Sequence, residues 1–411
     1  MSRIARFDNG LQIVTEAMPQ ASSVTIGVFV GVGSRDETQD QHGTSHFLEH
    51  LAFKGTSELS AKDLAVLVDS FGGDMNAFTT KELTSFQVRL LGEATDLGVD
   101  ILGKILTEPS FNVSDIESER NVILEEIAMA NDEPSDFVNE QLVASVYEQH
   151  SLGREVLGSR ESIPGIDRDV ICEFFSSFYG SANMVISAAG ALDHERIVEQ
   201  FSSSLGQISP GRVPERNASH LRFSDPVINE RDIEQAHISI AYPGIPRGDR
   251  RRWVMAMLDH VYGGGLSSRL FQKVREEGGL CYSIYSDRVT YQDSGYLGVY
   301  FSTSPFQLAR ALELVDSVTK ELSSAGVTEE ELAVAKRYLR AQVLLAREDT
   351  ASVMSQMGSV LVTGQQLKSI EEVLAEIERV SVNEVAELAA EVFAGSRQIS
   401  VVGPVPNGVF D

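Results

Sequence analysis

The sequence predicts an α+β protein built from two duplicated domains, and three observations support this. The chain has 411 residues, which is long for a single hydrophobic core and corresponds to roughly two to three domains. Segments of strand-like composition alternate with segments whose apolar residues follow the helical spacing of three and four. Features of the first half also recur in the second half at a nearly constant separation, as an internal duplication would produce.

Strand signals occur at both ends of each half. Asn9-Gly10 separates two short β-rich segments and predicts a hairpin, because a two-residue turn needs the positive φ angles that Asn and Gly tolerate. The longest β-rich run ends at Gly33-Ser34. The expected strands are residues 4–7, 11–15, 23–32, 75–80, 84–91 and 183–189, followed by 237–242 and 397–402 in the second half.

Capping residues mark where helices begin and end. Ser60 is a predicted N-cap, and Gly72-Gly73 ends the same helix, since Gly adopts the left-handed cap conformation at low cost. Residues 114–117 and 328–331 both have the capping-box pattern, in which Ser or Thr is followed by Glu three residues later. The expected helices are the segment around His46, residues 60–71, 114–133, 138–148, 169–178, 194–205 and 252–262, and a long helix that opens at Thr328.

The two halves repeat each other. The separation between Ser114 and Thr328, which open equivalent helices, nearly equals that between Gly190 and Gly403, which end equivalent strands. Two features at nearly the same offset indicate two copies of a domain of about 200 residues. Residues 209–217 contain turn formers and no apolar period, which is typical of a linker. The expected domains are therefore residues 1–208 and 223–411, joined by a linker at 209–222.

The composition argues against several kinds of partner. The net charge is −26, and both nucleic acids and anionic membrane surfaces require basic patches. No apolar run reaches the length of a membrane span, and the first residues lack the apolar core of a signal peptide. Cys172 and Cys281 show no Cys-x-x-Cys spacing, so free thiols are expected. A cytoplasmic protein is the resulting expectation.

The strongest chemical signal lies in the sequence His46-Phe47-Leu48-Glu49-His50. Residues three and four apart share one face of a helix, so the two histidines and the glutamate point the same way. Two imidazoles one turn apart suit zinc, and the carboxylate beside them suits a general base. The pattern is His-Glu-x-x-His reversed, the inverzincin arrangement. Taken alone, it is also typical of a solvated helix face or a satisfied polar cluster.

A third metal ligand has to come from a distant segment. In the helix expected at 114–133, Glu119 and Glu126 are two helical turns apart and face the same way, whereas Glu125 points about 100° away from Glu126. A carboxylate from this helix could complete the site if the fold brings it to the histidines. His260, which stands alone in the corresponding part of the second half, is read as a packed structural histidine.

Several stretches together resemble the pitrilysin-like M16 zinc peptidases, and they most resemble bacterial relatives of the mitochondrial processing peptidase β subunit. The likeness extends over nearly the whole chain, and the stretches that carry it are residues 46–50, 53–56, 73–80, 119–126, 267–271 and 275–282. It implies two domains, each a largely antiparallel β-sheet covered by helices. It also implies a zinc-dependent endopeptidase that hydrolyses extended or presequence-like peptides.

The resemblance further implies roles for individual residues. His46, His50 and Glu126 would bind one Zn2+ per chain, and Glu49 would be the catalytic base. Glu119 would orient a ligand histidine through its carboxylate.

Other implied roles concern the substrate. Asn76 and Ala77 match an edge strand that binds a peptide as an added β-strand, although the same residues are equally typical of an ordinary edge strand. Arg275 and Tyr282 match an Arg/Tyr pair that contacts substrate carbonyls near the scissile bond; standing alone, they would be read as a surface ion-pair residue and a half-buried ring.

Assembly and an alternative function follow from the same likeness. Four-domain family members form a chamber from two halves, with the Arg/Tyr pair in the half that lacks zinc. A two-domain chain that carries both sets is therefore expected to form a homodimer in which Arg275 and Tyr282 act in trans. The alternative is a non-catalytic structural or peptide-holding subunit, because relatives of this fold serve in that way.

Overall fold

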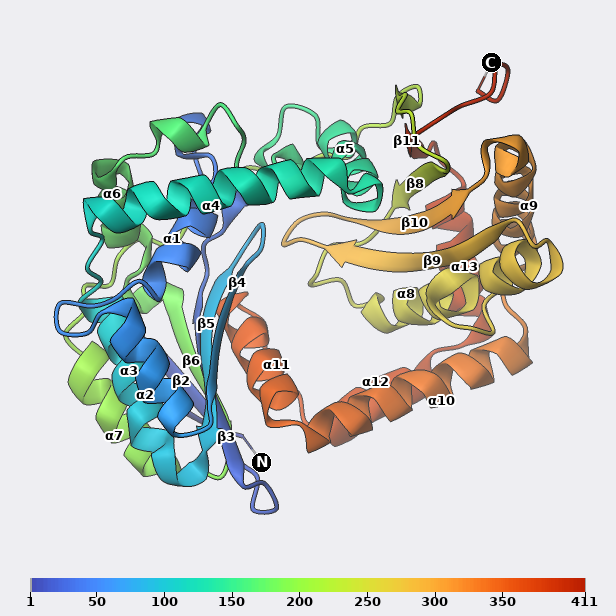
Figure 1. The fold of residues 1–411 in the computed structure, drawn as a ribbon. Helices are drawn as coiled ribbons and strands as arrows, with labels where there is room; N and C mark the ends of the chain where they lie inside the picture. Colours follow the sequence, from blue (N-terminus) through green and yellow to red (C-terminus); the bar gives the residue numbers. More distant parts are fainter. Residues whose placement is uncertain (1, 411) are drawn as a thin grey trace. The chain divides into compact units, whose positions relative to one another are not determined.

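The computed structural model describes residues 2–410, which fold into two compact units, each containing one β-sheet with helices packed against it (Figure 1). The α+β fold class is confirmed. The first unit comprises the chain up to Ala128, Arg154–Asn217 and Leu344–Ser369, and the second comprises Met129–Gly153, Ala218–Val343 and the chain from Ile370 onward. The predicted linker at 209–222 includes one of the points, between Asn217 and Ala218, where the chain passes between units. Two continuous domains are expected from the sequence, whereas each unit of the structure also contains a segment from the other half of the chain.

Six strands form the sheet of the first unit, in the order β1-β2-β6-β3-β5-β4. Neighbouring strands are antiparallel, apart from the parallel pair β2 and β6. The predicted hairpin is confirmed, since Ile4 pairs with Val14 and Gly10 has a φ of +92°. The strands are β1 (Arg3–Arg6), β2 (Gln12–Ala17), β3 (Ser23–Val30), β4 (Asp74–Thr79), β5 (Thr84–Leu91) and β6 (Met184–Gly190).

Helices cover both faces of this sheet (Figure 1). On one face, Ile26 and Val88 pack against Gly98 of α3, and on the other face Gly27 lies against Met354 of α11. The sheet is therefore apolar on both faces, as buried strands must be. The helices are α1 (Thr44–Ala52), α2 (Ala61–Ser70), α3 (Thr95–Thr107), α4 (Val113–Asp132, which begins in this unit), α6 (Arg168–Phe178), α7 (His194–Leu205) and α11 (Thr350–Val362).

The second unit repeats this plan with five strands, in the order β7-β11-β8-β10-β9. Its strands are β7 (Val227–Asn229), β8 (Ala236–Pro243), β9 (Cys281–Thr290), β10 (Gly295–Thr303) and β11 (Gln398–Val402). Its helices are α5 (Pro134–Val146), α8 (Arg252–Asp259), α9 (Leu308–Ala325), α10 (Glu329–Leu345), α12 (Ile370–Arg379) and α13 (Val382–Phe393), with π-helical turns at His260–Gly264 and Phe271–Glu277.

One helix of each half of the sequence packs on the sheet built mainly by the other half. The separation between α5 and α11 along the chain is close to the offset of the duplication. In the first unit, Ser187 of β6 donates a hydrogen bond to the carbonyl of Met354 in α11. In the second unit, Ser239 of β8 donates to Asn139 of α5. The two copies have thus exchanged equivalent helices.

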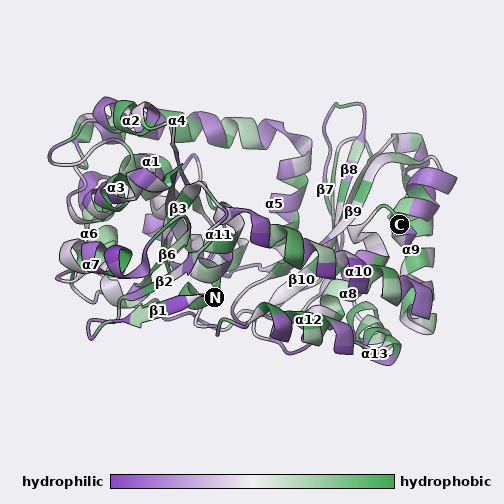
Figure 2. Ribbon diagram, turned by 90° about the horizontal axis from the view of Figure 1, so that it is seen from below, coloured by the Kyte–Doolittle hydropathy of each residue, from purple (hydrophilic) through white to green (hydrophobic). Residues whose placement is uncertain are grey.

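The helices owe their positions to one-sided apolar stripes. In Figure 2 hydrophilic and hydrophobic residues alternate around α7 and α12, and the buried residues of α7 are Ile197, Phe201 and Leu205, each one turn after the last. Within residues 2–410, no helix is both long enough and apolar enough to cross a membrane.

Two of the predicted helix caps are confirmed and one is wrong. Ser60 accepts a hydrogen bond from the Asp63 N–H, and Thr328 forms a reciprocal capping box with Glu331. Helix α4, however, already begins at Val113, so Ser114 lies within its first turn. Asn112 carries the start instead, since its carbonyl accepts the Ile116 N–H.

Candidate metal centre

Helix α1 carries the candidate ligands on one face and is anchored through its other faces. Gly43 precedes it with a φ of +99°, a left-handed conformation that favours glycine. Phe47, Leu48 and Leu51 are buried in the core of the first unit. The face formed by His46, Glu49 and His50 is consequently held in one orientation.

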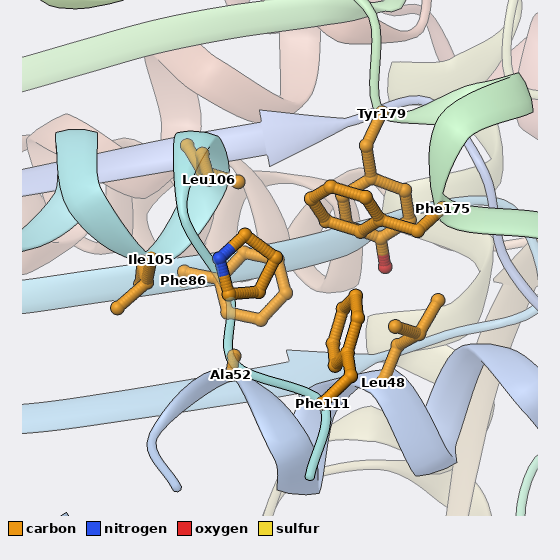
Figure 3. Close-up of a pocket in the computed structure, with 9 residues that line it drawn as sticks. Leu48, Ala52, Phe86, Ile105, Leu106, Phe111, Phe175 and Tyr179 are labelled. Carbon is orange, nitrogen blue, oxygen red and sulfur yellow. The ribbon is translucent and has the colours of Figure 1, made fainter. Parts of the chain in front are cut away.

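Aromatic side chains pack closely behind α1 (Figure 3). Leu48 and Ala52 from α1 meet Phe86 of β5, and the rings of Phe175 and Tyr179 stack 4.7 Å apart beside them. The cavity left between these side chains is only about 10 Å³, so they are closely packed. Close packing therefore fixes the helix that presents the metal-ligand face.

The structure brings His46, His50 and Glu126 together. Glu126 Oε2 lies 3.7 Å from His46 Nε2 and 3.4 Å from His50 Nε2, and the two rings are 4.6 Å apart. Within residues 2–410, these are the three side chains of His, Cys, Asp or Glu that are placed to hold a metal ion, with donor atoms all within 4.8 Å of one another. A tetrahedral ion about 2.0–2.2 Å from each donor requires similar separations, so the site fits zinc.

Burial shifts the pKa values of His46 and Glu49. It lowers the pKa of His46 to about 4, with a contribution from His50, so His46 is a neutral imidazole near pH 7, the form that binds metals. Burial also raises the pKa of Glu49, aided by the charge of Glu126, while hydrogen bonding to Thr79 and the charge of His50 act in the opposite direction. A carboxylate with a raised pKa is a stronger base.

His50 is oriented by a carboxylate on α4. Its Nδ1 lies 2.9 Å from Oε2 of Glu119, whose side chain is only 5% exposed. An imidazole that donates from Nδ1 presents the lone pair of Nε2, and Nε2 is the atom nearest Glu126. The other oxygen of Glu119 lies 2.5 Å from the ammonium of Lys54.

Asn76 and Ala77 lie on β4, an edge strand of the sheet in the first unit. They pair with Gln87 and Phe86 of β5 on one side. The Ala77 N–H donates to the side-chain oxygen of Asn76 over 2.9 Å. An added strand would have to replace that local hydrogen bond.

Arg275 and Tyr282 lie in the second unit, whereas the metal-ligand group lies in the first. The Arg275 guanidinium is 5.4 Å from the centre of the Tyr282 ring and 4.5 Å from that of Phe271. Tyr282 is 84% exposed, so its ring and hydroxyl are available for contact. Tyr282 lies at the start of β9, and Arg275, which is partly buried, lies in the π-helical turn Phe271–Glu277 just before that strand.

The position that corresponds to His46 in the second unit carries His260, at the same separation along the chain as that between Ser114 and Thr328. Its ring stacks on Tyr338 of α10 at a centroid distance of 4.2 Å and an angle of 20°. In α10, the helix that corresponds to α4, an aromatic ring thus contacts this histidine, in accord with the structural role expected for His260.

The sequence patterns predict no role for Lys54 or Glu37. Glu37 is buried in the loop before α1, where its carboxylate accepts the N–H groups of Gly43 and Ser45 over 2.8 and 2.7 Å. It thereby satisfies the start of the helix. Lys54 had a weak signal, since it follows His50 by one helical turn, but no loop pattern pointed to Glu37.

Comparisons with known proteins agree with this architecture. Residues 12–160 match the family model described as insulinase (peptidase family M16), and residues 165–339 match the model described as peptidase M16 inactive domain. The candidate ligands all lie within the first match.

Relatives align along almost the whole chain. An uncharacterized zinc protease of Streptomyces coelicolor is 38% identical over 96% of this chain and 88% of its own length. The uncharacterized zinc protease YmxG of Bacillus subtilis is 35% identical over 97% of both chains.

Solved structures share the fold. A protease from Helicobacter pylori has a TM-score of 0.92 at 20% identity, covering 98% of this chain and 99% of its own. A peptidase M16 inactive domain from Pseudomonas fluorescens has a TM-score of 0.91 at 20% identity, covering 98% of both chains. From the family matches and the near-full-length relatives together, the chain belongs to peptidase family M16.

Proposed function

We propose that this chain is a zinc-dependent endopeptidase that hydrolyses extended peptides. The observation that carries the proposal is the convergence of His46, His50 and Glu126, with Glu49 on the same helix face as the two histidines. Two nitrogen donors and one oxygen donor are a typical catalytic zinc set, which leaves a position for water or substrate. The names of the curated relatives, which are zinc proteases, support the same metal and reaction class.

Each residue of the site has a separate role in the proposed hydrolysis. Zinc, when bound, supplies a Lewis acid that polarises the peptide carbonyl and lowers the pKa of water to about 7. Glu49 takes a proton from the attacking water as the water oxygen bonds to the carbonyl carbon. It then gives that proton to the amine as the C–N bond breaks. Glu119 keeps His50 in the ligating orientation throughout.

Substrate would be held through its backbone. The edge strand β4, with Asn76 and Ala77, offers main-chain groups to an extended peptide, a mode that does not dictate side chains. The acidic chain, with a net charge of −26, suits Arg-rich, presequence-like segments. A cleavage profile on a peptide library would define the preferred residues.

We infer that the active enzyme is a homodimer in which Arg275 and Tyr282 of one copy contact the substrate at the zinc site of the other. Tyr282 is exposed and Arg275 is partly buried, and both lie in the unit that lacks the metal-ligand group. Both side chains donate hydrogen bonds, which suits contact with peptide carbonyls.

The test of hydrolysis is the Glu49→Gln variant. It should bind zinc like the wild type yet lose about 10²–10⁴-fold in kcat/KM on a long unstructured peptide, the usual contribution of a general base. Glu125→Gln is the matched control, because Glu125 is exposed on α4 and should retain both properties. Wild-type activity in Glu49→Gln would overturn the assignment. A wild-type protein that binds zinc and peptide but hydrolyses neither long nor short peptides would indicate a peptide-holding subunit instead.

A further inference from the structure

We propose that Lys54 is a positioning residue that sets the zinc affinity of the site, acting through Glu119 on His50. This inference rests on the proposed zinc site. The three side chains form a chain of contacts in which the Lys54 ammonium lies 2.5 Å from Glu119 Oε1, and Glu119 Oε2 lies 2.9 Å from His50 Nδ1.

The burial of Glu119 explains why it needs a cation. Its side chain is 5% exposed, and a carboxylate removed from water is costly unless it is paired and hydrogen-bonded. Both carboxylate oxygens of Glu119 are engaged, one by Lys54 and one by His50. The carboxylate therefore cannot rotate without breaking a contact, and the His50 ring is fixed in turn.

The two candidate histidine ligands are held in different ways. The Nδ1 of His46 is buried and has no hydrogen-bond partner within the described part of the chain, so packing alone orients that ring. The ring of His50 is less buried and is oriented by Glu119. Loss of Lys54 should therefore disturb His50 and leave His46 in place.

Lys54 is also well placed to hold this position. It lies just beyond the end of α1, where its N–H donates to the Leu51 carbonyl, and a cation at a helix C-terminus is favoured by the helix dipole. Its side chain is 37% exposed, so replacing it by a residue of similar length leaves no buried cavity. Lys54→Met should therefore disturb the fold little while it removes the positive charge completely.

The experiment measures zinc affinity by competition with a chelator. Lys54→Met should bind zinc about 10-fold more weakly, the lower end of the range for residues behind a ligand histidine, and Lys54→Arg should stay close to the wild type. Lys104→Met is the matched control, because Lys104 pairs with Glu58 and Asp100 in the same unit. At saturating zinc, kcat/KM of Lys54→Met should return to within about threefold of the wild type, since the defect is in metal binding.

A double-mutant cycle tests the route of the effect. In a Glu119→Gln background, Lys54→Met should cause no further loss of zinc affinity, because its partner is already gone. An equal loss in both backgrounds, or an unchanged affinity in Lys54→Met, would overturn the proposal. A wild-type protein that binds no zinc would instead overturn the proposed function, so the two failures are distinguishable. Metal-free thermal unfolding of each variant controls for folding.

Discussion

At the scale of single residues, Glu37 holds the start of α1 in place. Glu37 is buried, and its two oxygens accept the N–H groups of Gly43 and Ser45 at the start of the helix. Those hydrogen bonds and the charge of Arg154 favour the carboxylate, but burial has the larger effect and raises the pKa of Glu37 to about 7. The protonation state of Glu37 therefore affects the hydrogen bonds at the start of α1, the helix that carries His46.

The pH dependence of stability follows from the sign of that shift. The folded pKa of about 7 exceeds the ordinary glutamate value of 4.5, so the stabilisation from this group is full below about pH 4.5 and is lost as the pH rises to about 7. Glu37→Gln should be less stable than the wild type at pH 4.5 and below, because the glutamine amide nitrogen faces a backbone N–H. Its urea midpoint should nevertheless vary less between pH 4.5 and 7 than that of the wild type. Parallel pH profiles for the two proteins would contradict this assignment.

At the scale of elements, each sheet depends on a helix contributed by a distant part of the sequence. Helix α11 packs on β3 so closely that a Cβ at Gly358 would lie 2.1 Å from the Phe29 ring, which is itself fully buried. Glycine at this position is therefore required by space, since a helix interior ordinarily favours alanine.

Gly358→Ala should accordingly destabilise the protein. Helix propensity alone would make the substitution favourable by about 1 kcal/mol, but overpacking against a buried ring costs about 1–3 kcal/mol and should prevail. Gly165→Ala is the control, because a Cβ there meets nothing within 4 Å. Urea unfolding measures both, and a Gly358→Ala protein as stable as the wild type would show that α11 is not packed on β3 as described.

How much the sequence could predict also differs by element. Turn and cap chemistry is local, so the Asn9-Gly10 hairpin, the Ser60 cap and the bounds of β5 were all predictable. The cap predicted at Ser114 is wrong because Asn112 takes that position slightly earlier in the chain. The exchange of α5 and α11 was not predictable, since an apolar stripe shows that a helix is buried but not on which sheet.

The same limit applies to the metal centre. Helical spacing placed His46, Glu49 and His50 on one face, because those residues belong to a single helix. Glu126 belongs to a different helix, well beyond His50 in the sequence. Its position beside the histidines therefore depends on the fold, and only the likeness to a family predicts it. The contact between Lys54 and Glu119 is likewise long-range, and no pattern indicated it.

At the scale of the whole molecule, the proposed homodimer makes a prediction about mixtures. Glu49→Gln and Tyr282→Phe should each be weakly active alone, but a mixed dimer contains one site with both groups intact. A one-to-one mixture that exchanges freely should regain about a quarter of the wild-type sites. Peptide cleavage before and after subunit exchange measures this. An inactive mixture in which mixed dimers are shown to have formed would contradict the action of Tyr282 in trans.

The central claim is that His46, His50 and Glu126 together bind one zinc ion, and the zinc content of purified variants tests it most directly. The wild type and Glu125→Gln should each retain about one zinc per chain after dialysis, whereas Glu126→Gln should lose most of it because one of three protein ligands is gone. Equal zinc in Glu126→Gln and the wild type would contradict the site.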